Sequence, residues 1–190
     1  MKLYQIELPM LMEDDSEKDG RAEIVMDYII SWTLRRADIL CSTEKPILYK
    51  YCRQILATLL GLKLEDDMVF EMVKVWKQDQ NIDLWVELTV RQGNTSQRHA
   101  ILIEDKFYDK LRDHQLETYK DIFDNHYAKQ NEEWQKHYLL ISCVERGEKF
   151  DRLYGIAPTL GFKTFSFYEI FGKDHEECES DIFNEFWIRW

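Results

Sequence analysis

The chain has 190 residues, of which 45% are hydrophobic and 14% aromatic, with only three prolines and seven glycines. This composition is typical of one folded domain spanning residues 1–190, and it excludes a disordered or low-complexity chain. The formal net charge of -11 argues against broad, non-specific attraction to nucleic-acid phosphates, although a locally basic groove or a metal ion can supply positive charge.

The sequence also bears on location. No apolar run approaches the ~18 residues of a membrane-spanning helix, and the N-terminus lacks the pattern of a secretory signal. We therefore expect a cytoplasmic protein with no membrane partner. The cysteines show no close pairing, which favours reduced thiols; they are Cys41, Cys52, Cys143 and Cys178. His175 lies near Cys178, but two potential ligands do not make a zinc site.

Two helices are predicted over residues 21–61. The first, 21–36, has apolar residues at helical spacing, which predicts one buried stripe made of Ile24, Val25, Tyr28, Ile29 and Trp32. The second has Pro46 in its first turn and Gly61 just past its end, positions that suit these residue types. Its side chains expected to face the core are Ile47, Leu48, Tyr51, Ile55 and Leu59.

The central part of the chain, residues 69–144, alternates predicted strands and a helix. After a turn at Asp66 and Asp67, residues 68–76 form a good strand pattern. Two more apolar runs flank the polar segment 91–98, which predicts a hairpin with a long loop around Gly93. Residues 113–129 predict a helix that Asp109 or Asp113 caps. Its apolar side carries Leu116, Tyr119, Phe123 and Tyr127.

The remaining segments complete the fold prediction. Residues 137–144 are continuously apolar, as in a strand covered on both faces, and 164–168 predict a shorter last strand. The final segment has one apolar helical stripe, which suits a partner protein or a second copy of the chain: Ile182, Phe183, Phe186, Trp187 and Trp190. The order of elements predicts an α/β domain with a central mixed β-sheet flanked by helices.

Three charged residues interrupt strands that are otherwise apolar: Asp83, Glu104 and Lys106. Charges do not occupy core strands unless they are paired or bind a ligand. Because side chains two apart share a strand face, Glu104 and Lys106 lie side by side, and a suitable register brings Asp83 close to Glu104. A buried salt-bridge network is the alternative interpretation.

The chemistry of this trio indicates a metal site. Two neighbouring carboxylates repel each other unless a cation lies between them, and hard oxygen ligands suit Mg²⁺ or Mn²⁺. A lysine beside the ion can orient or help to deprotonate a bound water, which favours phosphodiester hydrolysis. Gln115 and Tyr119 project from one face of the following helix and can line the same cleft; the plainer alternative is a surface glutamine and a core tyrosine.

Together these motifs resemble the PD-(D/E)xK nuclease superfamily. Asp83 stands in I-D-L, Glu104 and Lys106 in I-L-I-E-D-K, and Gln115 and Tyr119 in Q-L-E-T-Y. The most similar branch carries a Q-x-x-x-Y helix, as in the RecB-like and lambda-exonuclease-like nucleases. The resemblance covers roughly residues 69–144, and it implies a restriction-endonuclease-like core with leading helices upstream.

The resemblance also implies roles for individual residues. Asp83, Glu104 and the backbone carbonyl of Asp105 bind Mg²⁺ or Mn²⁺, and Lys106 serves the attacking water. The Q-x-x-x-Y residues contact the nucleic acid or shape the cleft. The expected function is therefore that of a metal-dependent nuclease, most readily of DNA. The alternative is a catalytically inactive protein of the same fold that acts as a protein- or nucleic-acid-interaction module.

The chain departs from the family pattern in two ways. Ile82 stands where the family name has proline, and no histidine matches the metal-binding one of some RecB-like enzymes. Some members add an upstream acidic ligand, for which Glu23 and Glu71 are the candidates. Several basic residues near the motifs are candidates for phosphate contacts: Lys74, Lys77, Arg91, Arg98, Lys110, Arg112 and Lys120.

Overall fold

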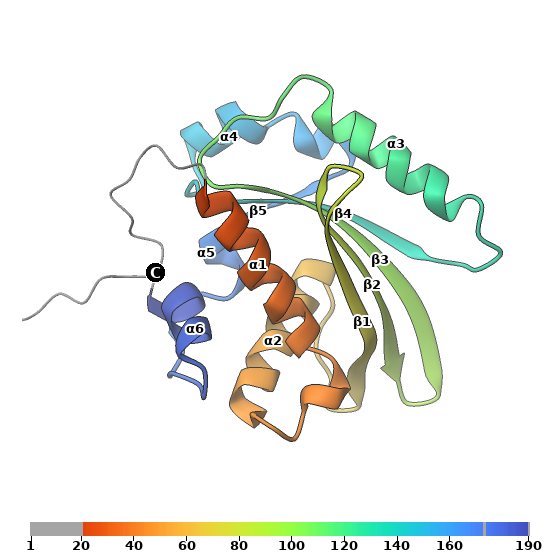
Figure 1. Ribbon diagram of the computed structural model, residues 1–190, viewed down its shortest axis with the longest axis vertical. Helices are drawn as coiled ribbons and strands as arrows, with labels where there is room; N and C mark the ends of the chain where they lie inside the picture. The colour runs from red at the N-terminus through yellow and green to blue at the C-terminus, as the bar shows by residue number, and fades with distance from the viewer. Residues whose placement is uncertain (1–20, 173, 190) are drawn as a thin grey trace, which may run out of the picture.

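The computed structural model describes residues 21–172 and 174–189, and it shows a five-stranded mixed sheet between helices (Figure 1). The strands follow chain order across the sheet. The antiparallel part is β1 (Met68–Asp79), β2 (Ile82–Gln92) and β3 (Thr95–Lys106). Parallel to β3 lie β4 (Gln135–Ser142) and then β5 (Lys163–Ser166). The predicted α/β class with a central mixed sheet is confirmed.

One face of the sheet packs on the two N-terminal helices, α1 (Arg21–Arg36) and α2 (Pro46–Leu60), with a short 3₁₀ turn (Ile39–Cys41) between them. Both helices are confirmed. Pro46 is the first residue of α2, and Gly61 ends it in the left-handed conformation, at φ 72°. Glycine suits that position because it has no Cβ to clash with the backbone.

The predicted stripe on α1 is confirmed at Ile29, Val25 and Trp32, which pack on the core, and wrong at two other positions. Ile24 and Tyr28 are 54% and 59% exposed, whereas Met26, Ile30 and Leu34 are fully buried. The helix carries apolar residues on more than one flank, so periodicity alone did not determine which flank faces the sheet. Ile47 on α2 is exposed for the same reason, and the four other predicted core residues of that helix are buried.

The opposite face of the sheet packs on α3 (Gln115–Tyr127), α4 (Glu148–Tyr154) and a 3₁₀ turn (Ala157–Leu160). The four apolar α3 side chains predicted to be buried are buried. Neither α4 nor the turn was predicted. Capping of α3 by Asp109 or Asp113 is also wrong, because the residue before the helix is His114, at φ 57°, and its side chain makes no capping bond.

The hairpin between β2 and β3 is tighter than predicted. Gln92 pairs with Thr95, so only Gly93 and Asn94 form the turn, and the rest of the polar segment 91–98 extends the two strands. Polar side chains are tolerated there because this end of the sheet is exposed to solvent. The turn between β1 and β2 is equally short, with Gln80 and Asn81 at φ 53° and 67°.

The C-terminal segment covers the α1–α2 side of the molecule. The predicted last strand is wrong at Phe167 and Tyr168, which begin α5 (Phe167–Ile170) behind a capping box at Ser166. After α6 (Asp181–Phe183) comes a π-helical segment (Asn184–Arg189).

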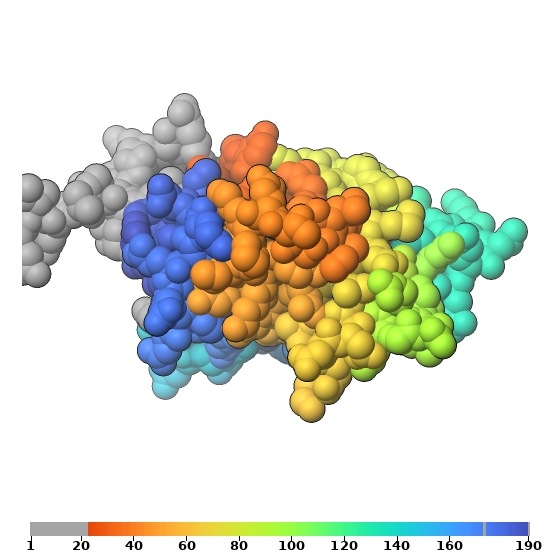
Figure 2. All heavy atoms as spheres, turned by 90° about the horizontal axis from the view of Figure 1, so that it is seen from below, coloured from red at the N-terminus to blue at the C-terminus, as the bar shows by residue number. Residues whose placement is uncertain are grey.

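The apolar stripe of this segment packs within the chain itself. Its buried members are Phe183, Phe186 and Trp187. Ile182 is 56% exposed, and Trp190 lies outside the described residues. Figure 2 shows the C-terminal segment, in blue, against α2, in orange; the Glu179 carboxylate accepts from two backbone N–H groups at the start of α2. Of the described helices, none combines the length and apolar character needed to cross a membrane.

Candidate active site

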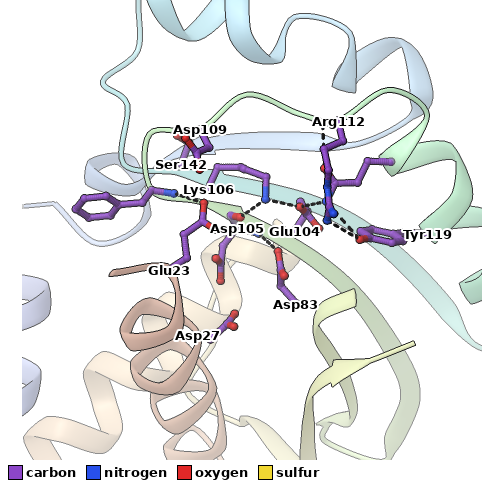
Figure 3. A network of polar contacts seen from close by, with 12 residues as sticks. Glu23, Asp27, Asp83, Glu104, Asp105, Lys106, Asp109, Arg112, Tyr119 and Ser142 are labelled. Carbon is purple, nitrogen blue, oxygen red and sulfur yellow. Dashed lines mark hydrogen bonds and ion pairs between the residues drawn. The ribbon is translucent and has the colours of Figure 1, made fainter. Parts of the chain in front are cut away.

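The strand register brings Asp83 and Glu104 face to face. Leu84 pairs with Ile103 across β2 and β3, and one further step along this register places Asp83 opposite Glu104. Glu104 and Lys106 share the face of Leu102, which packs in the core under α3. The site therefore lies at the end of the sheet, where β3 ends and the first turns of α1 and α3 approach it (Figure 3).

Glu104 is the centre of the polar network. Its Oε1 accepts from Lys106 Nζ at 2.6 Å and from Gln115 Nε2 at 2.5 Å, and its side chain is fully buried. Its second oxygen, Oε2, is also buried and has no hydrogen-bond partner. Burial, and then the charge of Asp83, raise the pKa of Glu104 to about 8. A buried oxygen left in this state indicates a position that a cation or a proton can satisfy.

Lys106 connects two of the expected metal ligands. Its ammonium donates to Glu104 and, at 3.1 Å, to the backbone carbonyl of Asp105. Burial lowers the pKa of Lys106. The negative charges of Glu104, Asp83 and Glu23 raise it by more, so the pKa of Lys106 lies above its usual range. The side chain is 9% exposed and stays charged across the physiological range.

Asp83 is held through both of its oxygens. Oδ2 accepts from the backbone N–H of Asp105 at 3.1 Å, and Oδ1 accepts from Gln78 Nε2 at 3.0 Å. The same Gln78 nitrogen donates to Asp27 on α1 at 3.1 Å. Gln78 takes a positive φ of 53°, a backbone conformation that is uncommon for a residue with a side chain. These contacts fix the carboxylate before any ligand arrives.

A second acidic pair lies beneath the strand. The side chain of Asp105 points to the face opposite that of Glu104, toward Asp27 (Figure 3), and the two carboxyl groups are within hydrogen-bonding reach. Burial, together with the charges of Asp27 and Asp83, raises the pKa of Asp105 well above its usual value, and burial raises the pKa of Asp27. The sequence analysis did not identify Asp27. The one sequence feature that could have indicated it is a carboxylate between buried residues of an amphipathic helix.

The structure distinguishes the two candidates for an upstream acidic ligand, Glu23 and Glu71. Glu23 on α1 accepts from the backbone N–H of Phe107, at 3.2 Å, directly after Lys106. Glu71 instead pairs with Arg91 at 2.7 Å. Because Glu71 lies opposite Thr89, six residues along β2 from position 83, it is roughly 20 Å from the site. Glu71 as a metal ligand is therefore wrong, while Glu23 lies beside the end of β3 and stays a prediction.

Gln115 and Tyr119 lie at different distances from the carboxylate of Glu104. Gln115 is 7% exposed and touches Glu104 directly. The Tyr119 hydroxyl lies behind it, 3.4 Å from both Gln115 Nε2 and a guanidinium nitrogen of Arg112. The structure therefore brings Gln115 to Glu104, whereas Tyr119 supports Gln115 and packs in the core.

The basic residues near the motifs also divide into two groups. Arg91 and Arg98 form ion pairs at the far end of the hairpin, and Lys120 donates to a backbone carbonyl. Lys110 and Arg112, by contrast, are exposed in the loop that leaves β3 beside the site. Of these five cations, only the last two are placed to meet a phosphate there.

No family model, curated protein or solved structure matches this chain. The interpretation of the site therefore depends on its own geometry. Among the described residues, no three His, Cys, Asp or Glu side chains gather closely enough to hold a metal ion. The available donors are the carboxylates of Asp83 and Glu104 and the carbonyl of Asp105. That set suits Mg²⁺, which commonly takes one or two carboxylates and keeps several waters, and the unpartnered Glu104 oxygen is the feature that fits it.

Proposed function

We propose that the protein is a metal-dependent nuclease of the PD-(D/E)xK type that hydrolyses phosphodiester bonds, most readily in DNA. The supporting observation is the convergence of Asp83, Glu104 and Lys106 on one sheet face, where a buried carboxylate keeps an unpartnered oxygen. A buried acid held in this way is more typical of a functional site than of a stabilising ion pair. The four free cysteines suit a cytoplasmic location.

Each residue has a role that follows from its contacts. Asp83, Glu104 and the Asp105 carbonyl would hold Mg²⁺ or Mn²⁺. The bound ion supplies positive charge for a phosphate oxygen and lowers the pKa of water. Lys106 keeps its proton because its pKa is raised, so it acts as a hydrogen-bond donor that orients the attacking water or the phosphate, not as a general base.

The supporting residues position the acids. Gln78 and the Asp105 N–H fix both oxygens of Asp83. Gln115 holds the carboxylate of Glu104 through Oε1, so the second oxygen of Glu104, Oε2, stays in one position. Such preorganisation matters because the groups that meet a ligand must be held close to their working geometry before it binds.

The direct test is cleavage of plasmid, linear duplex and single-stranded DNA with Mg²⁺ or Mn²⁺. Lys106→Met removes the ammonium but keeps the length of the side chain, and we expect it to abolish metal-dependent cleavage. Lys63→Met is the matched control, because Lys63 is 88% exposed and its ion pair with Glu65 lies on the surface. Circular dichroism verifies the fold of both variants. Cleavage that survives Lys106→Met would falsify the proposal.

A second candidate function also has an observation in its favour. The Lys106 ammonium already neutralises Glu104 and occupies the Asp105 carbonyl, so the cluster is partly satisfied without a metal. A protein that binds nucleic acid or another protein through this site without cleaving would fit that arrangement. Absence of both cleavage and Mn²⁺ binding, with retained association, would favour this interaction module.

A further inference from the structure

An exposed tyrosine with a lysine over its ring lies on one side of the acidic centre. Tyr28 on α1 is 59% exposed, and the Nζ of Lys77 on β1 lies 2.7 Å from the centroid of its ring. The two residues flank the supports of Asp83, because Tyr28 follows Asp27 and Lys77 precedes Gln78. The charge of Lys77 also acts on the Asp27 carboxyl and opposes the rise of its pKa.

A second pair of the same kind lies on the other side. Tyr108, two residues after Lys106, is 51% exposed, and the Nζ of Lys149 on α4 lies 5.4 Å from the centroid of its ring. The exposed cations Lys110 and Arg112 follow in the same loop. Two exposed aromatic rings therefore lie close in sequence to residues of the same polar network.

The order of strands places the acidic centre between the elements that carry the two pairs. Lys77 belongs to β1, at the edge of the sheet, while Lys149 belongs to the helix that follows β4. In the sheet, Asp83 on β2 and Glu104 on β3 lie between the edge strand β1 and β4.

We infer that a single-stranded nucleic-acid segment crosses the acidic centre between these two lysine–tyrosine pairs, with a base stacked on each ring and the lysines beside its phosphates. The inference rests on the proposed function for the class of ligand. Aromatic rings with nearby cations are the elements by which proteins hold single strands without reading their sequence.

A single strand fits these features better than a duplex. In a duplex the base faces are covered by their neighbours in the stack, so exposed tyrosine rings have nothing to stack on. Duplex binding also depends on many phosphate contacts from basic residues, and this chain has a net charge of -11. Stacking needs few cations, which matches a site flanked by two lysines and two loop residues.

Fluorescence anisotropy of the whole chain tests the inference, in EDTA so that no strand is cut. The probes are a labelled 12-nucleotide DNA strand, the same strand in a duplex, and RNA of the same sequence. We expect the single strand to bind at least tenfold more tightly than the duplex. Tyr28→Leu and Tyr108→Leu should each weaken it about tenfold, as loss of one stacked base implies.

Matched variants distinguish the loss of base stacking from other causes of weaker binding. Tyr28→Phe and Tyr108→Phe keep the ring and should bind as the wild type does. Leu40→Ala, at an 88% exposed position outside the site, should also have no effect. Thermal melting verifies that each variant folds. The RNA arm shows whether the strand must be DNA, because stacking alone does not distinguish the two sugars.

The outcomes distinguish this inference from the proposed function. Equal or tighter binding of the duplex, unchanged binding by both leucine variants, or no binding of any probe would overturn the inference. Metal-dependent cleavage that requires Lys106 would leave the nuclease proposal standing in each of these cases. Tyrosine-dependent binding of the single strand without any cleavage would support the inference and overturn the nuclease.

Discussion

The side-chain amide of Gln115 donates to the carboxylate of Glu104, with 2.5 Å between Nε2 and Oε1. This bond joins a helix residue to a strand residue eleven positions earlier in the chain. Because the same oxygen accepts from Lys106, the three side chains hold one another in place and leave only Oε2 of Glu104 free. The two motifs singled out in the sequence are therefore parts of one network.

Gln115→Ala tests how much that hydrogen bond contributes to activity. Residues that orient metal ligands typically change metal affinity or activity by roughly 10- to 100-fold when they are removed. We expect Gln115→Ala to reduce the rate of cleavage within that range and to raise the Mg²⁺ concentration needed for half-maximal rate. Tyr119→Phe is the comparison, since its hydroxyl makes only contacts of 3.4 Å and should cost less than about threefold.

Asp27→Asn should stabilise the fold. The variant removes one of two buried carboxyl groups that face each other, and the new amide can donate to Asp105. We expect a gain of about 1 kcal/mol in the free energy of unfolding, measured by urea denaturation at pH 8. Asp121→Asn, on the exposed side of α3, should give no gain. A loss of stability in Asp27→Asn would mean that the pair is a satisfied structural contact.

The histidine pair at the other end of β3 and β4 predicts a pH dependence. His99 Nδ1 and His137 Nε2 are 2.9 Å apart, and His99 is 1% exposed. Burial, with the charge of His137, lowers the pKa of His99 to about 4, and burial with Lys163 lowers the pKa of His137. Unfolded histidine has a pKa of about 6.5, so the unfolded state takes up protons first as the pH falls.

The contribution of His99 to stability should therefore be full above pH 6.5 and be lost between pH 6.5 and 4, by roughly 3 kcal/mol at most. Urea denaturation at several pH values measures this decrease. His99→Gln removes the titrating group, so the wild type should lose stability relative to this variant as the pH falls through that window. Identical slopes would show that the histidine pair does not contribute.

Gln80→Gly should stabilise the turn between β1 and β2. Gln80 and Asn81 both have positive φ, as a two-residue type I′ turn requires, and this conformation costs a residue with a side chain about 1 kcal/mol. We expect a gain of about 0.5–1 kcal/mol in the free energy of unfolding. Asn94→Gly in the other hairpin turn is the control, because φ at Asn94 is not positive and the change should bring no gain.

The parts of the fold that sequence could predict are those set by local chemistry. Pro46 and Gly61 mark the two ends of α2 because one fixes φ and the other tolerates a positive φ. The alternation of a strand predicted that Glu104 and Lys106 share a face, and the hairpin predicted that Asp83 lies near them. The register of β2 and β3 agrees with that arrangement.

The predictions that were wrong concern features that depend on packing between elements. Ile24 and Tyr28 have helical spacing, but which flank of α1 meets the sheet depends on residues far away in sequence. Glu71 was indistinguishable from Glu23 without the strand register, which shifts between Glu71 and Lys74. The roles of Asp27 and Gln78 required the approach of α1 to the end of the sheet, which no local pattern encodes.

The most direct test of the account is calorimetric titration of the wild-type chain with Mn²⁺, beside Glu104→Gln, Asp83→Asn and Glu71→Gln. We expect the wild type to bind Mn²⁺, the first two variants to lose that binding, and Glu71→Gln to keep it, because Glu71 is paired with Arg91 away from the site. Absence of Mn²⁺ binding by the wild type, or binding that survives in Glu104→Gln and Asp83→Asn alike, would contradict the claim that these two carboxylates share a cation.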